Sequence, residues 1–174
     1  MQTPDRKPNA QSCTGRKPLP SHFTASGIVI ELYHILLVHH KRIGAWLPPG
    51  GHIEEGEFPH ETCIREIFEE TGLAVEVVVS EPVPETASSD AFFPPQPLCL
   101  HIVKATEKGS ACFHLDLAYM CRVSGASDSL PVLSQAFEEC RWVKLDRLSE
   151  LLLAKNVTDL VQLALAKSQT GVIS

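Results

Sequence analysis

Residues 50–73 read GGHIEEGEFPHETCIREIFEETGL, and this stretch decides the fold. Pro59 stands where the first turn of a helix accepts proline, and Gly72 stands where helices commonly end on a left-handed glycine. Between them, four residues recur at the spacing of one helical face: Ile64, Ile67, Phe68 and Thr71. We therefore predict a helix over residues 59–71 that buries those four side chains.

The other side of this helix carries three glutamates, Glu66, Glu69 and Glu70. A solvated acidic face is the simpler interpretation, but two penalties oppose it. Glu66 repels the other two carboxylates, which follow at i+3 and i+4. Glu69 and Glu70 also lie in the last turn, where the helix dipole disfavours negative charge. Because a divalent cation would reverse both penalties, and Mg²⁺ prefers carboxylate oxygens, we predict a metal site here.

The residues before the helix are suited to support such a site. Gly50 and Gly51 let the backbone come close to a ligand, and the Gly50 carbonyl can face the metal. Arg65 lies beside the acidic face, where it can pair with Glu57 and fix the loop to the helix. The alternative is an ordinary helical pair between Arg65 and Glu69, four residues apart. The first arrangement gives Arg65 a positioning role.

Strands and helices follow on either side of this stretch. Runs rich in apolar and β-branched residues predict strands at 23–30, 33–39, 75–79, 98–104, 113–123 and 141–143. Two further helices are expected near the C-terminus, at 147–154 and 157–167. The glycine- and proline-rich residues 47–51 predict a turn, and residues 81–97, with five prolines, predict a long loop. This mixture of elements predicts one α/β or α+β domain.

Composition narrows the class of protein. The chain has 174 residues, 44% of them apolar, and a net charge of −6, which argues against a nucleic-acid-binding surface. No apolar run reaches the roughly 18–20 residues of a membrane span, so no membrane partner is expected. Residues 1–21 lack the apolar segment of a signal peptide and predict a flexible tail before one domain at 22–174. The six cysteines contain no C-x-x-C pair, so we expect free thiols and a cytoplasmic location.

The opening stretch resembles the Nudix box, G-x5-E-x7-R-E-U-x-E-E-x-G-U, in which U is an aliphatic residue. It matches at all nine fixed positions, which are Gly51, Glu57, Arg65, Glu66, Ile67, Glu69, Glu70, Gly72 and Leu73. The resemblance extends over about residues 23–153 and implies a Nudix-like α/β/α sandwich with a central mixed sheet. It also implies a hydrolase of nucleoside diphosphates linked to another group X, dependent on Mg²⁺ with Mn²⁺ as a substitute.

The resemblance also assigns roles to residues of the box. Three of them would bind the metal together with the Gly50 carbonyl: Glu66, Glu69 and Glu70. Glu57 and Arg65 would hold the loop and helix in their relative geometry. The metal would neutralise phosphate oxygens and orient a water for in-line attack on phosphorus. The base would be Glu66 or Glu69, or a loop acid, for which Glu138 is our candidate.

Candidates for substrate binding lie outside the box. Arg42 ends a basic run at residues 39–42, where cations can meet phosphate oxygens, although a solvated turn fits equally well. Three aromatic residues are candidates for stacking on a base: Trp46, Phe92 and Phe93. Trp46 can instead belong to the core. His114 and Asp116 share one face of a strand, with His101 on a neighbouring strand, which indicates either a second metal or substrate site or a hydrogen-bonded pair.

Two other functions fit the same fold. One is a nucleotide-sensing domain without turnover, and the other is an isoprenoid-diphosphate isomerase. Sensing domains usually lose carboxylates of the box, and all are present here, so the hydrolase is preferred. The expected partner is a small nucleotide or diphosphate substrate rather than a nucleic acid. The sequence leaves open the identity of X, the number of metal ions, and whether the chain is a monomer or a homodimer.

Overall fold

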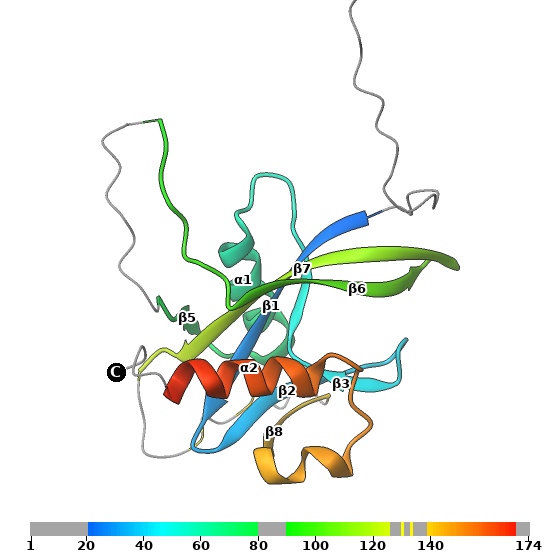
Figure 1. Cartoon of the computed structure of the whole chain (residues 1–174), viewed down its shortest axis with the longest axis vertical. Coiled ribbons are helices and arrows are strands. Elements are labelled where there is room, and N and C mark those ends of the chain that lie inside the picture. The colour runs from blue at the N-terminus through cyan, green and yellow to red at the C-terminus, as the bar shows by residue number, and fades with distance from the viewer. Residues whose placement is uncertain (1–20, 80–89, 126–129, 131–132, 134–138, 170–174) are drawn as a thin grey trace, which may run out of the picture.

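The computed structural model describes residues 21–79, 90–125, 130, 133 and 139–169. Within them, the strands are β1 (Ser21–Glu31), β2 (His34–His40), β3 (Ala45–Leu47), β4 (Gly50–His52), β5 (Val75–Val77), β6 (Cys99–Glu107), β7 (Ser110–Val123) and β8 (Cys140–Lys144). The helices are α1 (Pro59–Thr71), α2 (Val157–Gln169) and the short 3₁₀ helix η1 (Leu145–Glu150). Figure 1 shows their arrangement.

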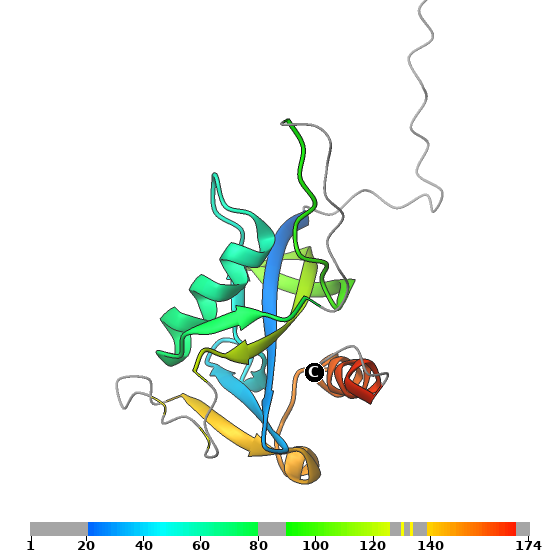
Figure 2. The ribbon, with the colours of Figure 1, turned by 90° about the vertical axis from the view of Figure 1, so that its left-hand side faces the viewer.

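These strands form one mixed sheet with β1 near its centre. The order is β3–β2–β1–β7–β5, with β4 also paired to β1, β6 to β7 and β8 to β2. β1 and β7 run parallel over nine residue pairs, whereas the other pairings are antiparallel. α1 covers one face of the sheet and α2 covers the other (Figure 2). The predicted α/β sandwich with a central mixed sheet is therefore confirmed.

Both faces of the sheet are buried, and the alternation of side chains along β1 and β2 shows how. Ile28 and Ile35 point into the core beneath α2, whereas Val29 and Leu36 point into the core beneath α1. All four side chains are fully buried. Because consecutive residues of a strand face opposite ways, two covered faces require an almost continuous apolar run. This explains why β1 and β2 lack a polar face over these residues.

The helix predicted over residues 59–71 is confirmed at both ends, but its buried face is rotated from the prediction. Gly72 adopts the left-handed conformation, with φ 75°, and its N–H donates to the Phe68 carbonyl. Phe68 itself is 57% exposed, whereas Cys63 is fully buried. The helix rests on Gly27, and a Cβ there would come within 3.0 Å of the Cys63 sulfur. This close approach turns Cys63 inward and Phe68 outward.

Two other expectations were wrong. Residues 47–51 are not one turn, because β3 and β4 lie within or beside them and β4 pairs with residues 24–26 of β1. Instead of the helix expected at 147–154, the structure has the 3₁₀ helix at 145–150. After it, the Trp46 N–H donates to the Leu152 carbonyl, and the Ala154 N–H donates to the Trp46 carbonyl. These bonds pull the chain beside β3 and end the helix.

Several predictions fall partly outside the described residues. Ser21 belongs to β1, while the rest of the expected tail and residues 80–89 of the expected loop are not described. The five cysteines in the described part of the chain form no disulfide with one another, in line with the expected thiols. Among the residues that the structure describes, no helix is long and apolar enough to cross a membrane.

Candidate active site

A network around Arg65 joins the loop before α1 to the helix. The Arg65 guanidinium donates to both carboxylate oxygens of Glu57, from Nε at 2.6 Å and from Nη2 at 3.0 Å. Thr62 donates a further bond to Glu57 at 2.7 Å. These bonds, Arg65 first, lower the pKa of Glu57 to about 2. The pair foreseen between Arg65 and Glu57 is therefore formed, and Glu57 stays ionised at neutral pH.

The same arginine also reaches two of the three glutamates on the exposed side of α1. Its Nη1 donates to Glu66 at 2.8 Å and to Glu69 at 3.0 Å. The helical pair considered as an alternative thus coexists with the Glu57 pair. Arg65 holds the loop with one part of its guanidinium and two carboxylates with the other. It fixes where those carboxylates lie.

Glu70, the third glutamate, is half-buried against β4. The N–H of Gly50 donates to its Oε2 at 3.0 Å. Burial raises the pKa of Glu70 to about 7, with smaller contributions from the nearby negative charges of Glu66 and Glu69, and the Gly50 bond only partly opposes this rise. Without a cation, the ionised form of this carboxylate is thus disfavoured. A divalent ion is the natural counter-charge for such a group.

Gly51 brings β4 into direct contact with Glu66. A Cβ built on Gly51 would overlap the Glu66 carboxylate, and one built on Gly50 would overlap the backbone of β1. Only glycine at these two positions allows the helix carboxylates, β4 and β1 to lie so close together. The Gly50–Gly51 backbone and the three glutamates therefore gather oxygen atoms along one edge of α1. Hard divalent cations favour such oxygens.

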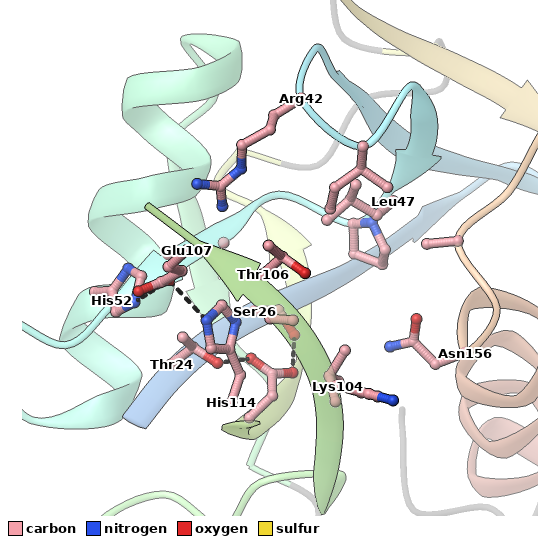
Figure 3. A pocket seen from close by; sticks show the side chains of 18 of the residues that line it. Thr24, Ser26, Arg42, Leu47, His52, Lys104, Thr106, Glu107, His114 and Asn156 are labelled. Carbon is pink, nitrogen blue, oxygen red and sulfur yellow. Dashed lines mark hydrogen bonds and ion pairs between the residues drawn. The ribbon is translucent and has the colours of Figure 1, made fainter. Parts of the chain in front are cut away.

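A cavity of about 650 Å³ opens on the α2 side of the sheet (Figure 3). Thr24 and Ser26 of β1 form part of its floor, and Gly50 and Gly51 form an edge that it shares with the glutamates. Its lysine and arginine side chains are Arg42, in the β2–β3 connection, Lys104 of β6, and Lys108, which directly follows β6. The volume lies within the roughly 300–1,000 Å³ of small-molecule sites. None of the three α1 glutamates lines it, so β4 separates the carboxylates from the cavity.

Asp116 is a buried residue that lines the cavity and accepts three hydrogen bonds. Thr24 donates to it at 2.8 Å, Ser26 at 2.6 Å, and the Nε2 of His101 at 2.8 Å. Burial alone would raise the pKa of Asp116, but these three bonds keep it below its ordinary value. Of the two alternatives for His101 and Asp116, the structure forms the hydrogen-bonded pair. The pair fixes the polar floor of the cavity.

The structure separates the four residues expected to bind substrate. Arg42 lines the cavity, whereas the other three do not. Trp46 contacts the core beneath α2, and the Arg141 guanidinium lies 3.8 Å from its ring centre. The ring of Phe92, 58% exposed, meets Phe58 edge to face at 5.0 Å, and Phe93 is half exposed. Glu138, the candidate loop acid, lies outside the described residues.

Sequence reasoning singled out His114 but missed the three residues that cluster with it beside the cavity. His52 and Glu107 line the cavity beside His114, and His22 lies next to them. One signal in the sequence could have indicated a polar face of the sheet. His22, Thr24 and Ser26 alternate along one strand, and His114 and Asp116 alternate along another. The pairing of His22 with His114 in the parallel β1–β7 ladder required the topology. His52 and Glu107 come from two further strands.

Comparison with known proteins places this geometry in a family. The sequence profile of the NUDIX domain matches residues 21–163. The chain is 32% identical over 104 residues to an RNA pyrophosphohydrolase of Dinoroseobacter shibae, covering 60% of this chain and 62% of that protein. It is 48% identical over 52 residues to Nudix hydrolase 25 of Arabidopsis thaliana, covering 30% of this chain and 28% of the other.

A solved NUDIX-family hydrolase from Clostridium perfringens matches most of the fold. It superposes with a TM-score of 0.59 at 26% identity, covering 87% of this chain and 99% of the other. The curated relatives are matched less completely, since the chain spans between 28% and 62% of the length of three of them. The match to the solved structure therefore supports the fold, and the sequence profile supports the family.

Proposed function

The chain belongs to the NUDIX domain family, and from that premise we propose that it hydrolyses the diphosphate linkage of a nucleoside diphosphate joined to another group X, using Mg²⁺. The observation that carries the proposal is the arrangement of three carboxylates along α1. Arg65 holds Glu66 and Glu69, and β4 holds Glu70. The three carboxylates of the box therefore lie on α1, each held by a contact with Arg65 or with β4.

The residues present fit a divalent ion. The contact of Glu66 with Gly51 leaves no room for a side chain there, and burial raises the pKa of Glu70 to about 7. Both features suit carboxylates that share a cation. Glu66, Glu69 and Glu70 would hold the ion with the Gly50 carbonyl. A bound Mg²⁺ or Mn²⁺ supplies charge neutralisation for the phosphate oxygens and lowers the pKa of a bound water.

The protein's own groups account for the rest of the reaction. Arg65 and Glu57 keep the loop and helix together, so that the carboxylates need no rearrangement when substrate binds. Glu66 or Glu69 takes the proton from the attacking water, with Glu138 as the loop alternative. Arg42 faces the cavity and can donate to phosphate oxygens that extend beyond the carboxylates. The cavity on the α2 side receives the remainder of the substrate.

A substrate panel tests this proposal. Purified protein is incubated with nucleoside triphosphates, oxidised nucleoside triphosphates, ADP-ribose, dinucleoside polyphosphates, nucleotide sugars and triphosphorylated RNA. Released phosphate and pyrophosphate are measured with coupled enzymes. We expect turnover of at least one class with Mg²⁺ or Mn²⁺ and none in excess chelator. Full turnover in chelator would contradict the metal mechanism. Tight binding without turnover would favour the sensing domain, and isomerised isoprenoid diphosphate would favour the isomerase.

A further inference from the structure

Four side chains from four strands converge beside the cavity: His22 of β1, His52 of β4, Glu107 of β6 and His114 of β7. Glu107 of β6 lies at their centre. Its Oε1 accepts from the Nε2 of His114 at 2.8 Å and lies 3.0 Å from the Nε2 of His52, and its Oε2 lies 3.7 Å from the Nε2 of His22 (Figure 3 shows all but His22). We propose that these four residues form a second metal site, which binds Zn²⁺ or a similar transition-metal ion.

The geometry of the ring nitrogens supports a metal. Two groups of three ligand atoms share Glu107, and within each group all atoms lie within 4.8 Å of one another: His22, His52 and Glu107, and Glu107, Cys112 and His114. Two ligands of a tetrahedral zinc, each about 2.0–2.1 Å from the ion, lie roughly 3.4 Å apart. His22 and His52 have side chains 43% and 48% exposed, so their rings can rotate by the small amount needed.

The chemistry of the donors selects a different ion from the one at α1. Three imidazoles and one carboxylate suit zinc and its neighbours, whereas Mg²⁺ prefers oxygen throughout. Cys112, buried two residues before His114 on the same strand face, adds a soft donor close by. The two sites therefore differ in the metal ion that their ligand atoms favour, although both border β4.

Sheet pairing holds the cluster in place. His22 is the Cα partner of His114 in the β1–β7 ladder, and His52 is the partner of Thr24, two residues along β1 from His22. The three rings meet one another edge to face, with centres 5.1–6.2 Å apart. The backbone thus sets the separation of the imidazoles before any ion binds. An ion bound there would add positive charge to the cavity wall, which Arg42, Lys104 and Lys108 also line.

Zinc binding in the presence of excess Mg²⁺ tests this inference independently of any hydrolysis. Metal-stripped full-length protein competes with a chromophoric chelator for Zn²⁺, and Co²⁺ loading gives a visible absorption band that reports tetrahedral coordination. We expect one equivalent of tight Zn²⁺. Glu107→Gln and His22→Gln should each weaken it at least about tenfold, since losing even an outer partner of a metal ligand costs that much.

Two matched variants separate this site from others. His34→Gln changes a histidine that donates only to the Leu32 carbonyl, and Glu69→Gln changes a carboxylate of α1. Both should keep full zinc affinity. Equal affinity in all four variants, or absence of tight Zn²⁺ in the unmodified protein, would overturn the proposal. Loss in Glu69→Gln alone would place the ion on α1 and overturn it too. Because His22 is half-exposed, its variant tests the idea even if Glu107→Gln fails to fold.

Discussion

At the scale of single residues, the α1 carboxylates differ although they share one helix. Glu69 is exposed and bonded to Arg65, whereas Glu70 is half-buried, bonded to the Gly50 N–H, and has a pKa raised to about 7. The environment rather than the residue type sets the difference. Glu70 is therefore the carboxylate with the most to gain from a cation and the least to contribute to stability without one.

We expect Glu70→Gln to lower kcat by roughly 10²–10³-fold, the loss typical when one electrostatic stabiliser of a transition state is removed. Stability should not fall. A folded-state pKa raised above 4.5 means that the ionised carboxylate destabilises the fold above about pH 7, and glutamine removes that charge. Steady-state kinetics and thermal melting without metal check both parts. Glu55→Gln, in the exposed loop, is the control; wild-type kcat in Glu70→Gln would remove its assignment as a ligand.

Gly51→Ala should lower kcat strongly and the melting temperature only slightly. The added methyl would overlap the Glu66 carboxylate, which must swing away from β4 and from the metal position. The flexible end of a side chain can move at little cost to the fold, so the damage falls on catalysis. Glu55→Ala, at an exposed position of the loop before α1, is the comparison. A large loss of melting temperature with unchanged kcat would show that the Gly51 contact serves folding alone.

At the scale of elements, the sequence predicted elements whose signal is local. It did not predict elements that form only by pairing with a distant strand. Pro59 and Gly72 fix both ends of α1 through backbone preferences that need no partner. β4 escaped prediction because Gly50–His52 becomes a strand only by pairing with β1. Phe68 was expected to be buried because it repeats with Ile64, yet the helix leans on Gly27 through Cys63 and Ile67. Residues that depend on a distant strand, such as Glu107 beside His52, carry no local signature.

The loop before α1 is held to the helix by charge, so its stability should depend on pH. The pKa of Glu57 is lowered from 4.5 to about 2, chiefly by Arg65. A lowered carboxylate pKa contributes stability that is present above the unfolded value and is lost as the pH falls toward the folded one. Glu57→Gln should therefore be less stable than wild type at neutral pH, and the gap should narrow between about pH 5 and pH 3.

Urea unfolding across that range measures the gap, with Glu55→Gln as the variant expected to match wild type throughout. A gap that stays constant with pH would mean that Glu57 acts through packing rather than through its ionised pair with Arg65. The lost pair should also loosen Glu66 and Glu69, which the same guanidinium holds. A lower kcat in Glu57→Gln at neutral pH would accompany the lost stability.

At the scale of the whole molecule, the residues proposed for chemistry and those proposed for selectivity lie on different faces of one sheet. The glutamates lie with α1, the cavity lies toward α2, and the Gly50–Gly51 edge joins them. The box could be recognised from the sequence because it is one continuous segment. The cavity could not, because its wall comes from β1, β4, β6, β7 and the start of α2. Substrate preference can therefore change without touching the carboxylates.

Arg42→Gln should raise KM about tenfold or more for substrates with additional phosphates and leave kcat nearly unchanged, because a charge-assisted bond contributes roughly 1.5–3 kcal/mol. Steady-state kinetics measure both constants, and an unchanged KM would remove Arg42 from the site.

Phe92→Ala separates two roles for the aromatic loop. Base stacking predicts a raised KM for one substrate class, whereas the contact with Phe58 predicts a lower melting temperature with all substrates affected alike. Measuring kcat/KM for two unlike substrates beside melting temperature decides between them.

The parallel pairing of β1 with β7 has a consequence during synthesis. Thr24 meets Asp116 across 92 residues of chain, so the central strand must wait for its neighbour to leave the ribosome. At about 5–20 residues per second this interval is roughly 5–18 s. Through it, the edge of β1 that β7 will take stays unpaired, because β2 and β4 pair with the opposite edge, while the β6–β7 hairpin can form as soon as it emerges. We therefore expect this edge to be open to wrong pairing until β7 emerges, so slower translation beyond β2 should lower the yield of folded protein.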